Sequence, residues 1–201
     1  SLTFLKQFVV APGQTGAVWP SSRHLADVMT RAAGVAEANV VLEFGPGTGS
    51  FTKAICRLLP SDARFIGFEI NPQFAPLLRQ QFPRMELVES SAVEARDYLD
   101  RCGIQYCDCI VSGLPFASFG EQLQDQLLHA ARSVLRPGGR LVTFTYLHSP
   151  CLPAGRQFKN KIGRFFETIE HTAIVWRNVP PAFAYCMYKA QQNTNEKGVN
   201  E

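Results

Sequence analysis

Three alternate glycines with a carboxylate in front of them form the most chemically informative stretch of this chain. Glu43 ends an apolar run, and Gly45, Gly47 and Gly49 follow it. Alternate glycines permit backbone angles that other residues avoid, and they let a ligand approach the main chain. Free amides at the start of a following helix would face that ligand. Because the Glu43 carboxylate would repel a phosphate, the turn favours a ligand with a positively charged amino group.

A second carboxylate ends the next apolar run. Glu69 follows the segment 64–68 and lies 20 residues beyond Gly49. An acid at this strand end can accept both ribose hydroxyls of a nucleoside. An amino group and a nucleoside in one ligand point to S-adenosylmethionine (SAM), whereas a dinucleotide fingerprint has the spacing G-x-G-x-x-G. Taken singly, the glycine run is also compatible with a plain strand-to-helix turn, and Glu69 with a helix cap or a solvent-facing acid.

Alternating strand-like and helix-like segments supply the elements that must position these groups. They predict a parallel sheet with helices on both faces. The predicted strands are 39–44, 64–69, 86–90, 107–112 and 139–147, and the predicted helices are 50–59, 72–82, 92–101 and 119–135. Two further strands, 168–176 and 182–189, predict an antiparallel hairpin at the end of the sheet.

Local signals set some of these boundaries. Asn71-Pro72 favours a helix start at Pro72, and residues 136–139, with the sequence Arg-Pro-Gly-Gly, favour a turn before the fifth strand. Ligands of open α/β sheets bind at the carboxyl ends of the strands, near the point where strand order reverses. We therefore expect Glu43, Glu69 and Ser112 to surround one ligand.

The run E-x-G-x-G-x-G, followed by a strand that ends in an acid, resembles the class I SAM-dependent methyltransferases over residues 36–190. The resemblance implies a Rossmann-like α/β fold with a seven-stranded, mostly parallel sheet. It implies that the three glycines line the methionine part of SAM, that Glu43 approaches its amino group and that Glu69 holds its ribose. It also implies cofactor contacts that follow the strand ends, at Ile70, Ser91, Ala92 and Ser112. Ser91 stands where the family usually has an acid that contacts adenine.

The fourth predicted strand leads into Gly113-Leu114-Pro115-Phe116. This has the outline of the Asn-Pro-Pro-Tyr motif of methyltransferases that act on planar amines, with Gly113 in place of Asn and Phe116 in place of Tyr. Glycine has no side chain to orient a planar amine, so a flexible aliphatic amine is the better substrate. Gly113 and Leu114 would line its site, and Phe116, Tyr146 and Trp19 could stabilise its growing positive charge through cation–π contacts.

Four segments resemble, more specifically, the bacterial phospholipid N-methyltransferases, which convert phosphatidylethanolamine to phosphatidylcholine and are similar in sequence to rRNA adenine dimethylases. These segments are 16–23, 112–116, 144–146 and 175–182. The last of them, with its Trp-Arg-Asn-x-Pro-Pro-Ala run, is the most specific.

Further site residues are predicted around this substrate. Tyr146 and His148 follow the fifth strand and are the catalytic candidates, Tyr146 to orient the amine and His148 as a titrating base. We expect 149–163 to be a loop whose cations, Arg156, Lys159 and Lys161, hold a lipid phosphate or anionic headgroups. Arg177 either holds substrate phosphate or pairs with an acid. Each of these aromatic and basic residues is also compatible with ordinary packing or a solvated surface.

Composition sets the broad class. The 201 residues, 46% of them hydrophobic, fit one globular domain, and a net charge of +3 does not indicate a nucleic-acid partner. No apolar run is long enough to span a bilayer and no signal peptide is visible, so we expect a monomer in the cytoplasm, peripherally bound to the inner face of the membrane. We expect the six cysteines to be reduced and no metal to be bound, with Cys107 and Cys109 alternating along a buried strand.

The predicted organisation has three parts. Residues 1–35 form an arm over the active site, 36–190 the SAM-binding domain and 191–201 a polar tail. Apolar residues at helical spacing within 1–10 favour a short helix that lies in a membrane interface or packs on the domain's own core. Two other functions remain open, an rRNA or other nucleic-acid N-methyltransferase and a SAM-binding membrane-surface protein without catalysis.

Overall fold

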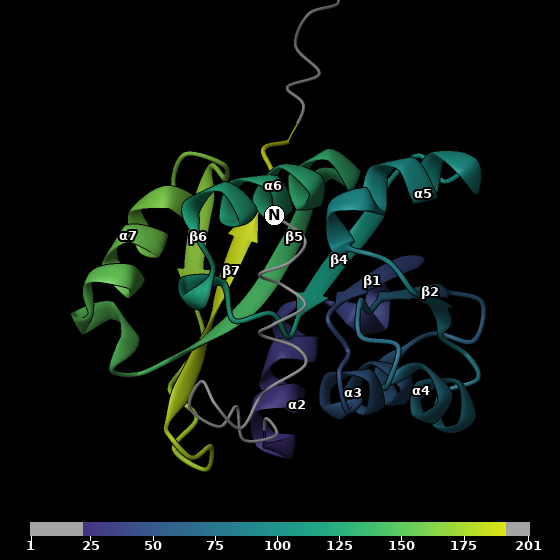
Figure 1. Cartoon of the computed structure of the whole chain (residues 1–201), viewed down its shortest axis with the longest axis horizontal. Coiled ribbons are helices and arrows are strands. Elements are labelled where there is room, and N and C mark those ends of the chain that lie inside the picture. The colour runs from purple at the N-terminus through teal and green to yellow at the C-terminus, as the bar shows by residue number, and fades with distance from the viewer. Residues whose placement is uncertain (1–21, 192–201) are drawn as a thin grey trace, which may run out of the picture.

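The structure, a computed structural model, describes residues 22–191. Residues 1–21 of the predicted arm 1–35, with Trp19 and the apolar helix expected within 1–10, lie outside this part of the chain, as do residues 192–201 of the polar tail. The described residues form a seven-stranded sheet with the order β3-β2-β1-β4-β5-β7-β6 (Figure 1). The predicted α/β class and the mixed seven-stranded sheet are confirmed.

Five strands of the sheet are parallel. They are β1 (Val40–Phe44), β2 (Arg64–Phe68), β3 (Glu86–Val88), β4 (Cys107–Ser112) and β5 (Leu135–Tyr146). The antiparallel pair is β7 (Ala182–Tyr188), which lies between β5 and the edge strand β6 (Thr168–His171). The strand order reverses between β1 and β4, and the turns after these strands lie where an open α/β sheet binds its ligand.

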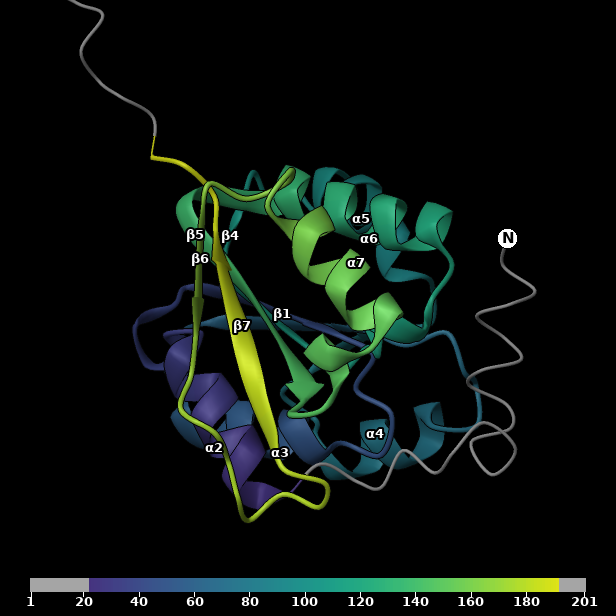
Figure 2. The ribbon, with the colours of Figure 1, turned by 90° about the vertical axis from the view of Figure 1, so that its left-hand side faces the viewer.

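Within residues 22–191, six α-helices cover the sheet in two layers. They are α2 (Arg23–Ala32), α3 (Ser50–Leu58), α4 (Ala75–Gln81), α5 (Ala95–Arg101), α6 (Glu121–Val134) and α7 (Pro153–Ile162). Figure 2 shows α2, α3 and α4 on one face and α5, α6 and α7 on the other. Each layer buries its apolar stripe against the sheet, so the described residues have two hydrophobic clusters separated by the strands.

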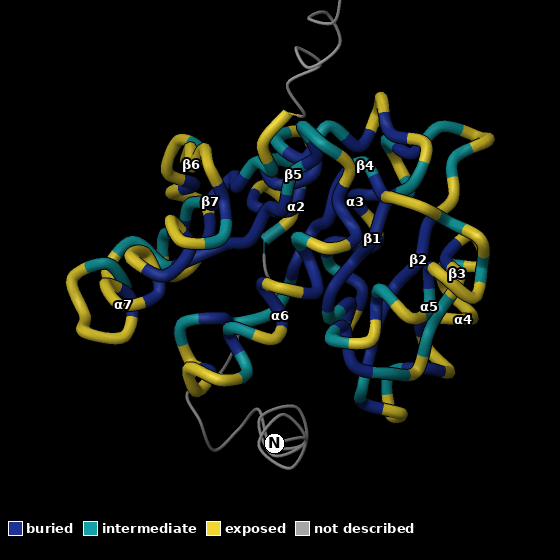
Figure 3. The backbone as a smooth tube through the Cα atoms, turned by 90° about the horizontal axis from the view of Figure 1, so that it is seen from above, coloured by how far each residue is buried: buried dark blue, intermediate teal, exposed yellow. Residues whose placement is uncertain are grey.

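The inner strands of the sheet, such as β1 and β4, are mostly buried (Figure 3), whereas the edge strand β6 is exposed and β3 has no buried residue. Within β4, Cys107 and Cys109 are both buried and alternate with the half-buried Asp108, as predicted. All six cysteines are free thiols. Burial raises the pKa of Cys109 to about 12, so this thiol is inert at neutral pH.

Two predicted boundaries are wrong for local reasons. The helix expected from Pro72 begins at Ala75, because the Asn71 side chain accepts a hydrogen bond from the Gln73 amide (3.0 Å) and closes a turn first. Residues 136–139 do not separate a helix from a strand. They belong to β5 and form a bulge in its pairing with β4: Cys107 pairs with Leu135, but Cys109, two residues on, pairs with Arg140.

Two elements near the end of the chain also differ from prediction. The loop expected over 149–163 contains a helix, α7, preceded by the short turn of 3₁₀ helix Ser149–Cys151. Pro153 occupies the first helical turn, where its missing amide costs nothing. The strand expected over 168–176 ends at His171, and beyond it Val175 forms an isolated bridge to Ala182 of β7.

Candidate active site at the carboxyl edge of the sheet

The carboxyl ends of β2, β1 and β4 lie side by side. In the sheet register Phe44 pairs with Phe68 on one side and with Ser112 on the other. The pairing continues into the turns, since the Gly45 amide donates to the Phe68 carbonyl and the Gly113 amide to the Phe44 carbonyl, both at 2.9 Å. The structure thus brings Glu43, Glu69 and Ser112 to neighbouring strand ends.

The glycine turn depends on glycine for more than one reason. Gly45, Gly47 and Gly49 all have positive φ angles (71°, 56° and 85°). A Cβ on Gly45 would lie 2.5 Å from Leu114, and one on Gly49 would lie 2.4 Å from the Phe82 ring. A Cβ on Gly47 would meet nothing within 4 Å. The turn is therefore packed at its two ends and open at its middle.

This difference predicts a larger loss of stability from one of two matched substitutions than from the other. Gly49→Ala is expected to lower the free energy of unfolding by about 2–4 kcal/mol, because strain at positive φ adds to a clash with Phe82. Gly47→Ala is expected to cost only the backbone strain of about 1–2 kcal/mol and to weaken SAM binding through loss of open space. Urea unfolding and calorimetric titration with SAM would measure both. Equal destabilisation by the two substitutions would contradict this packing.

Glu43 lies beneath the turn with its side chain fully buried. Its Oε2 accepts a hydrogen bond from the Thr52 hydroxyl (2.8 Å), and its Oε1 has no hydrogen-bond partner among the described residues. Burial raises the pKa of Glu43 to about 8. The hydrogen bond from Thr52 lowers this pKa, and the charge of Glu69 raises it further. A buried carboxylate with one unpaired oxygen is suited to pair with a cationic group, which the amino group of SAM would supply.

Glu69 is also buried, with 4% of its surface exposed, but both of its oxygens have partners. Oε2 accepts from the Gly47 amide (2.9 Å) and Oε1 from the Asn71 amide (2.8 Å). Burial raises the pKa of Glu69, and hydrogen bonds from Asn71, Gly47 and Ile70 oppose the rise. The carboxylate therefore ties the end of β2 to the glycine turn, and its remaining lone pairs are what a ribose diol would use.

The predicted serines cap the turns at this edge. Ser91 Oγ accepts from the Val93 amide (3.3 Å) and starts the 3₁₀ turn Ala92–Glu94. Ser112 Oγ, fully buried, accepts from the Leu114 amide (3.3 Å). Both hydroxyls keep their proton available for a further acceptor.

Gly113 and Phe116 have structural roles that sequence reasoning missed. A Cβ on Gly113 would lie 2.8 Å from the Gly45 carbonyl oxygen and 3.3 Å from the Phe51 ring, so an asparagine would not fit without a backbone shift. Phe116 is 2% exposed and stacks on Phe158 with ring centroids 5.3 Å apart. The prediction that the Phe116 ring contacts the substrate is therefore wrong, because the ring lies in the core.

Tyr146 and His148 form an aromatic pair at the end of β5. Their rings are parallel, with centroids 5.9 Å apart, and Phe144 packs edge-on against Tyr146. Tyr146 is half-buried and His148 is exposed. Burial raises the pKa of Tyr146, so its phenol keeps its proton at neutral pH.

The predicted phosphate-binding cations fall into separate places. Arg156 and Lys159 are exposed on α7, whereas Arg177 is exposed on the connection between β6 and β7, 3.2 Å from His24 Nε2. Lys161 is buried, pairs with Asp125 (2.9 Å) and donates to the Glu121 carbonyl (3.0 Å). The prediction for Lys161 is wrong, since its ammonium joins α7 to α6.

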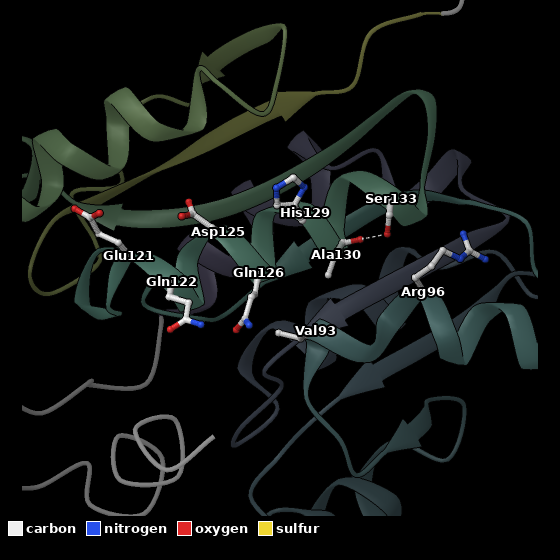
Figure 4. Close-up of a pocket in the computed structure, with 9 residues that line it drawn as sticks. All are labelled: Val93, Arg96, Glu121, Gln122, Asp125, Gln126, His129, Ala130 and Ser133. Carbon is white, nitrogen blue, oxygen red and sulfur yellow. Dashed lines mark hydrogen bonds between the residues drawn. The ribbon is translucent and has the colours of Figure 1, made fainter. Parts of the chain in front are cut away.

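An open groove of about 770 Å³ lies between α5 and α6 (Figure 4). It is lined by Val93, Arg96, Glu121, Gln122, Asp125, Gln126, His129, Ala130 and Ser133. Sequence analysis did not find it, because these are ordinary polar and small residues on two helix faces that are far apart in sequence.

None of the helices within residues 22–191 combines the length and apolarity needed to span a bilayer.

The fold and this edge of the sheet define a class I SAM-dependent methyltransferase. The order of the seven strands, the glycine turn after β1 and the acids that end β1 and β2 all belong to this class. Buried Glu43 with its unpaired oxygen and the open middle of the glycine turn fit the cofactor SAM.

Comparison with known proteins agrees. Residues 41–139 match the family model of a methyltransferase domain. The chain is 34% identical over 185 residues to an ornithine lipid N-methyltransferase of Singulisphaera acidiphila. This alignment covers 90% of this chain and 92% of that protein. It is 36% identical to ribosomal RNA small subunit methyltransferase A of Chlorobaculum parvum over only 61 residues, 30% of this chain and 21% of that enzyme. The O-methyltransferase TomG of Streptomyces achromogenes, solved in complex with SAM, has the same fold, with a TM-score of 0.65, 18% identity and coverage of 92% and 89% of the two chains.

The chain belongs to the family of SAM-dependent methyltransferases that includes the Singulisphaera enzyme.

Proposed function

We propose that this enzyme transfers methyl groups from SAM to the amine of a membrane-lipid headgroup. The observation that carries the proposal is the 34% identity to an ornithine lipid N-methyltransferase over nine-tenths of both chains. Phosphatidylethanolamine, which sequence analysis predicted, and ornithine lipid both present an aliphatic amine. We further propose that the enzyme is a monomer that binds peripherally to the cytoplasmic side of a membrane. Its relative's lipid substrate supports the membrane association.

The residues at the sheet edge support this chemistry. When bound, SAM supplies a methyl group on a positively charged sulfonium. In the proposal, the unpaired Oε1 of Glu43 holds the cofactor's amino group, and Glu69 holds the ribose hydroxyls. Ser91, Ala92 and Ile70 border the adenine side, since they follow the ends of β3 and β2.

The amine needs orientation and loss of a proton before it can act as a nucleophile. Gly113 offers no amide side chain, so the site places no obligatory hydrogen bond on a nitrogen that loses its protons as methylation proceeds. The protonated phenol of Tyr146 positions the amine, and exposed His148, stacked against it, accepts the proton from the ammonium form.

The proposal is tested by incubating the protein with radiolabelled SAM and micelles that contain either phosphatidylethanolamine or ornithine lipid. We expect label in one or both lipids, separated by thin-layer chromatography. An rRNA transcript serves as the competing substrate. Label in RNA alone, or SAM binding with no transfer to any amine lipid, would overturn the proposal in favour of the nucleic-acid or the non-catalytic function. The tight approach of Gly113 to Gly45 counts against the former, because it excludes the asparagine of base-modifying enzymes.

Tyr146→Phe is expected to lower kcat about tenfold while leaving the Kd for SAM unchanged, because only the amine-positioning hydroxyl is lost. Steady-state methyl transfer and calorimetry measure the two quantities. Tyr106→Phe removes the same atom from an exposed tyrosine just before β4, at the opposite edge of the sheet, and should change neither. Full turnover by Tyr146→Phe would remove Tyr146 from the mechanism.

A further inference from the structure

The connection between β6 and β7, residues 172–181 and called here the β6–β7 loop, exposes an unusual amount of apolar surface. Val179 and Trp176 are 76% and 67% exposed, the highest values among the large hydrophobic residues of the described chain, and Ile174 is 37% exposed. A tryptophan held in water loses the favourable burial of a large ring. A patch of this kind indicates an interaction surface.

The β6–β7 loop is built to hold these side chains outward. Asn178 is 4% exposed, and its side chain accepts from the Ser22 amide (2.9 Å) and donates to the Pro180 carbonyl (2.7 Å). Val175 is buried, and its amide donates to the Ala182 carbonyl (2.7 Å). The two inward residues fix the loop, and the residues between and beside them face solvent.

The loop lies at the edge of the sheet that carries the active site. Ala182, its neighbour in β7, pairs with Tyr146 at the end of β5. Figure 2 shows the loop reaching beyond α2 at the end of the sheet where β5 terminates. Leu152, 51% exposed, precedes α7 and follows the same end of β5. Apolar side chains therefore protrude on the side from which a lipid would enter.

The charges beside the loop favour an anionic partner. A groove of about 520 Å³ between the loop and α2 is bordered by His24, Arg31 and Arg177. The one acid that lines it, Asp27, is paired with Arg57 and lies 3.9 Å from Arg23. Within residues 22–191, neither Arg31 nor Arg177 has an ion pair with a carboxylate. The surface thus combines a protruding tryptophan with uncompensated arginines.

We propose that the β6–β7 loop docks the enzyme on an anionic phospholipid bilayer. Trp176 and Val179 enter the interface, where tryptophan is favoured, and Arg177 and Arg31 contact lipid phosphates. The inference rests on the proposed function, because docking in this orientation presents the carboxyl edge of the sheet to membrane lipids. The β6–β7 loop is a separate surface from the apolar helix predicted within residues 1–10.

Co-sedimentation with vesicles tests the proposal. Trp176→Ala and Val179→Asp should each lower the partition coefficient onto vesicles of phosphatidylcholine and phosphatidylglycerol about tenfold. Both residues are exposed, so unchanged far-ultraviolet circular dichroism is expected. Tyr106→Ala removes an exposed aromatic from the opposite edge of the sheet and should bind as the unsubstituted protein does. Binding by both loop variants equal to that of the unsubstituted protein would overturn the proposal.

Fluorescence gives a second readout, because the chain has two tryptophans. In a Trp19→Phe background, Trp176 emission should shift to the blue and become shielded from iodide when the anionic vesicles are added. Vesicles of phosphatidylcholine alone should give a smaller shift. Shielding of Trp176 before any vesicle is present would mean that a second copy of the chain or another of its segments covers the loop, and would overturn the proposal.

Methyl transfer in two lipid settings separates this inference from the proposed function. Loop variants that lose transfer to an aminolipid in anionic vesicles but keep it in detergent micelles support docking through the loop. Loss of transfer by the unsubstituted protein in both settings, with the fluorescence shift retained, would overturn the proposed function alone. If the loop variants transfer methyl groups as fast as the unsubstituted protein in both vesicles and micelles, docking through the loop is overturned and the proposed function stands.

Discussion

Glu43→Gln is expected to make the ligand-free protein more stable and at the same time nearly unable to bind SAM. The side chain is fully buried and its pKa is raised from 4.5 to about 8. Each unit of such a shift corresponds to about 1.4 kcal/mol, so the ionised carboxylate is a large destabilising element above neutral pH. Glutamine keeps an oxygen for the Thr52 hydroxyl and removes the buried charge.

The pH dependence of this effect has a defined sign. In the unfolded chain Glu43 loses its proton near its ordinary pKa of 4.5, whereas in the folded protein it keeps the proton to about pH 8. Between these values the unfolded state binds fewer protons, so the contribution of Glu43 to stability falls as pH rises and levels off above pH 8. Glu43→Gln should abolish this fall and raise the free energy of unfolding at pH 8 by about 2–4 kcal/mol.

Urea unfolding across pH 5 to 9 and calorimetric titration with SAM would measure the two consequences. We expect the Kd for SAM to rise about 100-fold, since a charge-assisted contact to the cofactor's amino group is lost. Glu37→Gln makes the same change of formal charge at an exposed position and should leave both quantities unchanged. A variant of Glu43 that unfolds at lower urea concentration at pH 8, or that binds SAM normally, would show that the buried carboxylate has another purpose.

Glu69→Ala is expected to weaken SAM binding about 100-fold and to lower stability by about 1–3 kcal/mol. Its carboxylate accepts from the Gly47 and Asn71 amides, so truncation leaves two backbone donors without partners as well as removing the ribose contact. Affinity for SAM is therefore expected to fall in both Glu69→Ala and Glu43→Gln, whereas stability is expected to fall in the first and to rise in the second.

Glu69→Gln separates the two roles. The amide oxygen still accepts one of the backbone hydrogen bonds, so most of the stability should return, while the loss of charge keeps SAM binding about tenfold weaker than in the unsubstituted protein. Glu89→Gln, at an exposed acid paired with Arg79 on the surface, serves as a control. Unchanged affinity for SAM in Glu69→Ala would exclude a role for this residue in holding the cofactor.

The sequence was sufficient for the features that depend on local patterns. The predicted strand 107–112 matches β4 to the residue, because its mostly apolar run and its flanking turns are local signals. The placement of Glu43, Glu69 and Ser112 at adjacent strand ends followed from the rule that parallel strands present their carboxyl ends at one edge.

Features that depend on tertiary contacts were not predictable. From sequence alone Lys161 was predicted to be a surface cation, but in the fold it pairs with Asp125 of α6. Phe116 was predicted to line the substrate cleft, but its ring stacks on Phe158 of α7. The close approach of Gly113 to the Gly45 carbonyl requires coordinates of two turns that are far apart in sequence. Asn178 looked like part of a family marker, and only its contacts with Ser22 and Pro180 reveal it as the anchor of the β6–β7 loop.

The position of β7 has a consequence for biosynthesis. This strand is the last of the sheet in the chain, yet it inserts between β5 and β6 and its Ala184 and Met187 are fully buried. A nascent polypeptide that has emerged only as far as residue 180 therefore presents the long edge of β5 unpaired, and such edges recruit other strands. The sheet closes only after residues up to about 188 have emerged, so a chain truncated within β7 would keep the β5 edge unpaired and be prone to aggregation.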